Sequence, residues 1–263
     1  MSYETLQIHE TTEQVVELRL NRPELHNAFN EKMIEELTNV FVKFRDQKKL
    51  RLIVVTGEGP SFSAGADLNW MAKLAKKTAQ ENKEDSLSLA KLFDVLDQFP
   101  LPVIGRVTGP AYGGGVGLMA ICDEVVMLES AQWGLTEVRL GLVPAVISPF
   151  VANKIGHSHA RRLFVSGARV SAHEALKLGL AHHLAKDLAE LDSKVQDLIK
   201  IYLEAAPLAQ IEAKKLAKKF RYEIPSAQLA TLIAELRVGS EAQEGMSALL
   251  EKRKPTWITG KGK

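Results

Sequence analysis

Cysteine is nearly absent from this 263-residue chain: Cys122 is the single one, so no disulfide can form within it. Disulfide frameworks belong to oxidising compartments, and their exclusion leads us to expect a reducing one. Cys122 lies in an apolar helical context without an obvious acid–base partner. We interpret it as a buried packing residue, as free cysteines often are.

The chain also lacks long apolar runs and targeting segments. No apolar run approaches the ~20 residues that cross a membrane. The N-terminal stretch MSYETLQIHE is polar and acidic, and it forms neither an apolar signal core nor an Arg-rich presequence. We therefore expect a cytoplasmic protein that does not use a membrane.

Neither net charge nor histidine spacing indicates a specific partner. There are 34 Lys and Arg against 32 Asp and Glu, so the net charge of +2 gives no general argument for nucleic acid. Basic side chains are in excess from residue 200 onward, which favours a phosphate-bearing ligand there. The pairs His157 with His159 and His182 with His183 have no acidic or Cys neighbours at metal-ligand spacing, so we expect no metal site.

Glycine, by contrast, is concentrated in two turns. GPAYGGGVGL at residues 109–118 follows the apolar run PVIGRV, and GEGPSFSAGADLNWM follows the apolar strand RLIVVTG. Without a Cβ the backbone can approach a ligand, so that N–H groups point at a developing negative charge. One donor from each turn would make an oxyanion hole, and we expect the N–H groups of Ala64 and Gly114. The alternative is a pair of tightly packed strand-to-helix turns.

Strand, glycine turn and helix thus occur twice, at residues 53–71 and 103–122, which predicts an α/β architecture of repeated units. Alternation at 3–9 and 15–20 predicts a hairpin, and apolar spacing predicts a helix over 30–48 with Asn30 as its cap. A helical pattern with polar interruptions runs up to residue 99. We expect further helices at 148–156, 158–166 and 171–178, a short strand at 180–184, and helices at 187–205, 207–220, 226–237 and 240–253.

Three segments, SFSAGADLNWM, GPAYGGGVGLMAICD and LTEVRLGLVPA, resemble the signature segments of the crotonase, or enoyl-CoA hydratase/isomerase, superfamily. Their order and spacing fit over essentially the whole chain. The resemblance implies a crotonase-like spiral of ββα units over residues 1–200. It also implies a helical C-terminal region, 201–263, that builds a homotrimer or dimer of trimers and covers the site. The substrate would be an acyl-CoA thioester, with no separate cofactor.

The resemblance also implies roles for individual residues. Ala64 and Gly114 would hold the thioester oxygen through their amides, and Glu137 would be the acid–base group. The residues that would contact the CoA, in part through backbone atoms, are His26, Ala28, Ala66, Asp67, Leu68 and Lys252. For Asp67 we favour a second interpretation, as a first-turn acid that complements the helix dipole.

Family hydratases generally have two glutamates, and this sequence has Gly117 where the first would stand. One carboxylate must then both activate water and deliver the proton, or receive help. Family isomerases can work with one glutamate at the position of Glu137, so isomerisation is the alternative function.

ADLNWM and EVRLGLVPAVISPF are most similar to the bacterial branch that acts on 3-methylglutaconyl-CoA. A substrate carboxylate could then help to hold the water, with Gly117 leaving room for the branched acyl chain.

Two other functions are open at this point. Gly115, Gly117 and Ala120 match the dinucleotide pattern G-x-G-x-x-A, but Gly109, Pro110, Ala111 and Tyr112 intervene between the preceding strand and this pattern. The acidic Glu129 also comes earlier than the pattern requires. The basic stretch KKLAKKFRY, residues 214–222, could bind RNA. A solvated helix face, or one turned to the phosphates of CoA, is the simpler interpretation of that stretch.

Overall fold

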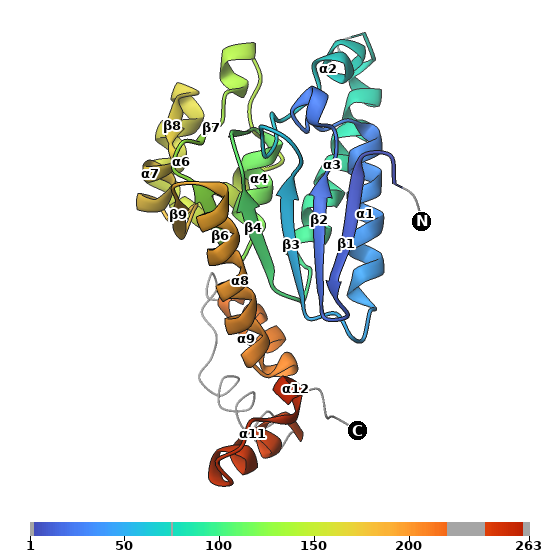
Figure 1. Ribbon diagram of the computed structural model, residues 1–263. Helices are drawn as coiled ribbons and strands as arrows, with labels where there is room; N and C mark the ends of the chain where they lie inside the picture. The colour runs from blue at the N-terminus through green and yellow to red at the C-terminus, as the bar shows by residue number, and fades with distance from the viewer. Residues whose placement is uncertain (1–2, 75, 220–239, 260–263) are drawn as a thin grey trace. The chain divides into compact units, whose positions relative to one another are not determined.

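The computed structural model describes residues 3–74, 76–219 and 240–259 (Figure 1). The chain forms two compact units. The first comprises Met1–Phe99 and Val103–Gln196, and the second comprises Pro100–Pro102 and Asp197–Lys263. Each unit is considered by itself below.

The first unit is organised around a six-stranded sheet with the order β1-β2-β3-β4-β6-β9 (Figure 1). Its strands are β1 (Leu6–Thr12), β2 (Val15–Leu20), β3 (Leu52–Gly57), β4 (Val103–Val107), β6 (Glu124–Leu128) and β9 (His183–Ala185). β1 and β2 form the predicted antiparallel hairpin, and every later pairing in this sheet is parallel. β3 is buried along its whole length, as its uninterrupted apolar sequence predicts.

Helices α1 (Glu31–Arg45) and α3 (Ala79–Asp97) pack against each other beside this sheet. The Asn30 side chain accepts a hydrogen bond from the Met33 amide, so the predicted N-cap is confirmed. The helical pattern before residue 99 is divided into α2 (Leu68–Leu74) and α3, because Thr78 and Glu81 form a capping box that starts a new helix.

A second sheet, with the order β5-β7-β8, was not expected from the sequence. Its strands β5 (Ala111–Tyr112), β7 (Gln132–Gly134) and β8 (Arg169–Ser171) are two or three residues long, too short for a periodic signal. The surrounding helices are α4 (Gly114–Ile121), α5 (Ser148–Ile155), α6 (His157–Ser166) and α7 (Ala172–Lys177), with 3-10 turns η1 (Pro23–Leu25) and η2 (Glu137–Leu140).

The second unit is helical where the structure describes it. α8 (Leu188–Glu204) leads into it, and α9 (Pro207–Lys219), α11 (Ser240–Leu250) and α12 (Thr256–Thr259) follow. The Glu241 carboxylate accepts hydrogen bonds from the Leu208 and Ala209 amides and so caps α9. The helix predicted over 226–237 lies outside the described residues. The use of this region for assembly, and the division at residue 200, stay predictions.

None of the helices in the described ranges is long and apolar enough to span a membrane. The same residues contain no group of three His, Cys, Asp or Glu side chains that could hold a metal ion.

Candidate active site

The two glycine turns meet backbone to backbone. The Ser63 carbonyl accepts the Tyr112 amide at 2.9 Å, and the Pro110 carbonyl accepts the Ser63 amide at 3.2 Å. Gly65 and Gly113 both have positive φ, 89° and 47°. A Cβ placed on Gly65 would lie 3.0 Å from the Tyr112 carbonyl oxygen and 3.5 Å from the Gly113 Cα. The two turns can therefore approach this closely only because these glycines carry no side chain.

Ala66, and not Ala64, presents the free amide of the first turn. The Ala64 N–H donates to the His26 carbonyl at 2.8 Å, so the prediction that Ala64 supplies an oxyanion donor is wrong. The Ala66 N–H has no acceptor among the described residues, and Ala66 is exposed. Phe29 fixes the backbone on both sides of it, because its amide donates to the Gly65 carbonyl and its carbonyl accepts the Asp67 amide.

Gly114 provides the second amide. It is the first residue of α4, where helix geometry leaves the N–H groups without intrahelical acceptors. The start of a helix also carries a partial positive charge, which favours an anion. Gly114 is partly exposed. One free donor thus comes from each turn, as expected, with Ala66 in the place of Ala64.

Glu137 is brought to the same place by the small sheet. β5 and β7 pair in parallel, with Tyr112 opposite Gly134, and the Gly113 amide donates to the Gly134 carbonyl at 3.2 Å. η2 begins three residues later with Glu137. A Cβ on Gly113 would lie 3.2 Å from Glu137 Oε1. The carboxylate therefore borders the turn that carries the Gly114 amide.

The Glu137 carboxyl is largely buried, and one of its oxygens lacks a partner. Its Oε2 is buried and has no hydrogen-bond partner among the described residues. Burial raises the pKa of Glu137 above the ordinary value, although a hydrogen bond from its own backbone opposes this. A carboxyl whose pKa is raised towards neutrality can both take up and release a proton.

Gly117 faces packed apolar side chains. A Cβ there would lie 2.6 Å from Ile147 Cγ2 and 2.7 Å from the ring of Phe93, and both residues are buried. The hypothesis that Gly117 leaves room for a branched acyl chain is therefore wrong, because Phe93 and Ile147 already occupy that space. The same packing leaves no place for a second carboxylate at this helix position.

The predicted CoA contacts fall into two groups. His26 and Leu68 are exposed beside the turns, and the His26 Nδ1 lies 2.9 Å from Ser61 Oγ. Lys252 is exposed in the second unit, so its role stays a prediction. Ala28 and Asp67, in contrast, are buried, and the structure uses their backbone groups internally.

Asp67 is a structural residue in this site. Its amide donates to the Phe29 carbonyl, its carbonyl accepts the Met71 amide, and its carboxylate pairs with Arg22 at 2.7 Å. Its backbone polar groups are thus used internally, and a contact with the CoA stays a prediction. The second interpretation is closer, since Asp67 Oδ1 accepts the Asn69 and Trp70 amides at the start of α2.

Sequence reasoning missed Arg22 and Asn27, which organise the first turn. Asn27 is fully buried with φ 55°, and its side chain accepts the Arg22 amide and donates to the Glu58 and Ser61 carbonyls. The signal was present in NRPELHNAFN, where a basic side chain and an amide flank a proline turn. From this stretch the resemblance implies roles only for His26 and Ala28, as CoA contacts.

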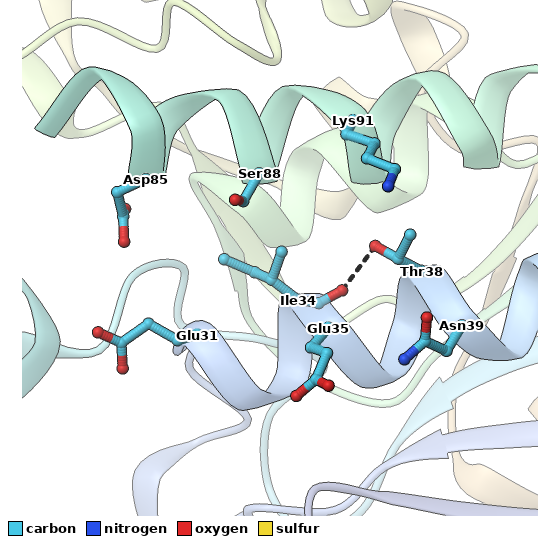
Figure 2. Close-up of a pocket in the computed structure, with 8 residues that line it drawn as sticks. All are labelled: Glu31, Ile34, Glu35, Thr38, Asn39, Asp85, Ser88 and Lys91. Carbon is cyan, nitrogen blue, oxygen red and sulfur yellow. Dashed lines mark hydrogen bonds between the residues drawn. The ribbon is translucent and has the colours of Figure 1, made fainter. Parts of the chain in front are cut away.

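A surface groove between α1 and α3 is separate from these residues. Figure 2 shows Asp85 on α3 opposite Glu31 on α1, with Lys91 towards the other end. Glu35 adds a third carboxylate to its lining. None of the predicted site residues lines this groove, and its acidic character opposes the binding of a phosphate-bearing ligand.

Comparisons with known proteins identify the family. The sequence profile of the enoyl-CoA hydratase/isomerase family matches residues 10–260. The chain belongs to this family. An enoyl-CoA hydratase structure from Shewanella pealeana has 37% identity and a TM-score of 0.91, covering 97% of this chain and 96% of that one. Pseudomonas aeruginosa AtuE has 33% identity and a TM-score of 0.93, with 97% and 100% covered.

A curated relative extends the comparison to a named substrate. The 2,3-dehydroadipyl-CoA hydratase of Escherichia coli is 32% identical over 247 residues, which are 92% of this chain and 94% of that protein. The fold is thus the crotonase fold, and the protein is an enzyme of the enoyl-CoA hydratase family. Gly115, Gly117 and Ala120 are therefore interpreted as part of this family's glycine turn and not as a dinucleotide-binding motif.

Gly117→Ala is expected to destabilise this enzyme. The added methyl overlaps Phe93 and Ile147, and overpacking typically costs about 1–3 kcal/mol, which exceeds the gain of up to ~1 kcal/mol in helix propensity. Denaturant unfolding measures the change. In a Phe93→Leu background the penalty should shrink, since the nearest ring atoms are gone. An equal penalty in both backgrounds would show that Phe93 does not fill this space.

Glu137→Gln is expected to change how stability depends on pH. Because burial raises the folded-state pKa, the native protein binds more protons than the unfolded chain above the ordinary value of about 4.3. The wild-type free energy of unfolding should therefore fall, relative to Glu137→Gln, as pH rises from 4 through the raised pKa. Denaturant titrations at several pH values measure this, with the exposed Glu24→Gln as control. A difference that stays constant with pH contradicts the assignment.

Proposed function

We propose that this enzyme adds water across the 2,3 double bond of an enoyl-CoA thioester through an enolate. The Ala66 and Gly114 amides hold the oxyanion, and Glu137 moves the proton. The observation that carries the proposal is the buried, unpartnered Glu137 Oε2 beside the glycine turn. Preorganised amide donors are worth about 2.7–4 kcal/mol each in transition states of this kind.

One carboxylate is sufficient for the whole reaction. The Glu137 carboxylate takes a proton from water as the water oxygen bonds to C3, and the double-bond electrons move to the thioester oxygen. The enolate then collapses, and C2 takes the proton back from Glu137. The hydroxyl and the hydrogen thus come from one water molecule, and the carboxylate returns to its starting state. The raised pKa suits a group that alternates between base and acid.

For the acyl group we propose a branched, carboxylate-bearing enoyl chain of the 3-methylglutaconyl type. The resemblance of ADLNWM and EVRLGLVPAVISPF supports this, as does a relative named for a dehydroadipyl thioester, a second dicarboxylic acyl group. Phe93 and Ile147 fill the position where a second acid would hold the water. The free carboxylate of the substrate would supply that hydrogen-bond acceptor instead.

Double-bond isomerisation is the second candidate, and the packing around Gly117 favours it. A base that removes a proton from C4 and returns it to C2 needs no partner acid, only an oxyanion hole for the dienolate. Glu137 and the two amides meet that requirement as well.

The homotrimer or dimer of trimers and the cytoplasmic location also stay proposals. RNA binding has weaker support, since α9 uses some of its lysines internally. Lys214 donates to the Leu101 carbonyl, and Lys215 pairs with Glu212.

Incubation with crotonyl-CoA and 3-methylglutaconyl-CoA in H₂¹⁸O tests the function. We expect ¹⁸O in a 3-hydroxyacyl product and faster turnover of 3-methylglutaconyl-CoA. Glu137→Gln should lower kcat by about 10²–10⁴-fold, the usual contribution of acid–base catalysis, while Glu24→Gln should not. A shifted double bond without label would establish isomerisation. Equal turnover of both thioesters would contradict assistance by the substrate carboxylate.

A further inference from the structure

Arg22 links two segments of the candidate active site. It follows β2 and precedes η1, and its side chain is 13% exposed. Nη1 donates to the Ala28 carbonyl at 2.6 Å, and Nη2 donates to Asp67 Oδ2 at 2.7 Å. One guanidinium therefore bridges the chain just before Phe29 and the chain just after Ala66. A planar fork of donors can make both bonds at once, whereas an ammonium cannot reproduce that geometry.

The two ends of this bridge frame the Ala66 peptide. Phe29, next to Ala28, bonds the Gly65 carbonyl and the Asp67 amide. The Asp67 carboxylate reaches the Asn69 and Trp70 amides of α2 and is 6% exposed. Ala66 thus lies between two anchored peptide groups, and its own N–H has no acceptor in the described part of the chain.

We propose that Arg22 is a positioning residue of the oxyanion hole, which acts through Asp67 and the Ala28 carbonyl to aim the Ala66 N–H at the thioester oxygen. This rests on the proposed function, because it requires that the Ala66 amide polarises a thioester. Arg22 itself does not touch the substrate. Its loss tilts the Ala66 peptide away from the Gly114 amide without removing any donor.

The charge state of Asp67 fits this role. Burial by itself would raise the pKa of Asp67, but hydrogen bonds from Arg22 and from the Trp70 and Asn69 amides outweigh it and hold the pKa below the ordinary value. The ion pair therefore stays intact over the range in which Glu137 changes its protonation state.

Arg22→Lys tests the proposal, with Arg19→Lys as the matched control. Arg19 lies on β2 and also bridges two carboxylates, those of Glu17 and Glu58. Glu58 stands at the start of the first turn, and Arg19, unlike Arg22, makes no hydrogen bond to Ala28 or Asp67. We expect kcat of Arg22→Lys to fall by about 10–100-fold with little change in KM, since a misplacement of ~1 Å can cost about 10²-fold. Arg19→Lys should retain the wild-type kcat.

A spectroscopic measurement separates positioning from a general loss of structure. Hydrogen bonds to the carbonyl oxygen of a conjugated thioester move its absorption to longer wavelength, so a bound 2,4-dienoyl-CoA reports the oxyanion hole directly. We expect the red shift in the wild type and in Arg19→Lys, and a smaller one in Arg22→Lys at saturating ligand. If Arg22→Lys does not fold by circular dichroism, Asp67→Asn, which keeps the side-chain volume, should show the same reduction.

The outcomes are distinguishable. A full red shift and unchanged kcat in a folded Arg22→Lys or Asp67→Asn overturn the positioning role and leave the proposed function standing. If the wild type shows no red shift, the result contradicts the oxyanion hole itself and therefore also the positioning role of Arg22. A higher KM in Arg22→Lys, with kcat and the red shift retained, would make Arg22 a residue for CoA binding and would also overturn the proposal.

Discussion

The close approach of Gly65 and Gly113 is the constraint on which the rest of the site depends. Side chains at either position would separate the two turns, because a Cβ on Gly65 would press on the Tyr112 carbonyl and one on Gly113 on Glu137. Their absence lets two free amides and one carboxylate share a small volume. The large sheet supplies the two parallel strands, β3 and β4, that lead into these turns, and the small sheet positions η2 with Glu137.

Two carboxylates near this junction have opposite environments. Asp67 is paired with Arg22 and with backbone amides, and its pKa is lowered; Glu137 is buried without a partner at Oε2, and its pKa is raised. Carboxylates whose surroundings move their pKa values apart commonly divide the work of an active site. In the proposed function the charged one fixes the backbone and the protonatable one carries the proton transfer.

The sequence predicted much of this and failed at definable points. Apolar runs and glycine turns are local signals, so the strands, the Asn30 cap and the two glycine turns could be predicted from the residues. The place of Glu137 beside these turns was implied only by the resemblance to the crotonase superfamily. The choice between Ala64 and Ala66 could not, because it depends on His26 and Phe29, which reach the turn from almost forty positions earlier in the chain. The hypothesis that Gly117 leaves room for an acyl chain failed for a similar reason, since Phe93 and Ile147, which fill that space, are distant from it in sequence.

A crystal structure with a bound, unreactive acyl-CoA thioester tests the central claim most directly. We predict that the thioester oxygen lies within about 2.7–3.1 Å of both the Ala66 and the Gly114 amide nitrogens, the range expected for an oxyanion hole. The Ala64 amide should remain bonded to His26, and Glu137 should face C2 and C3 of the acyl chain. A thioester oxygen bound to the Ala64 amide, or one placed away from both turns, would contradict the account.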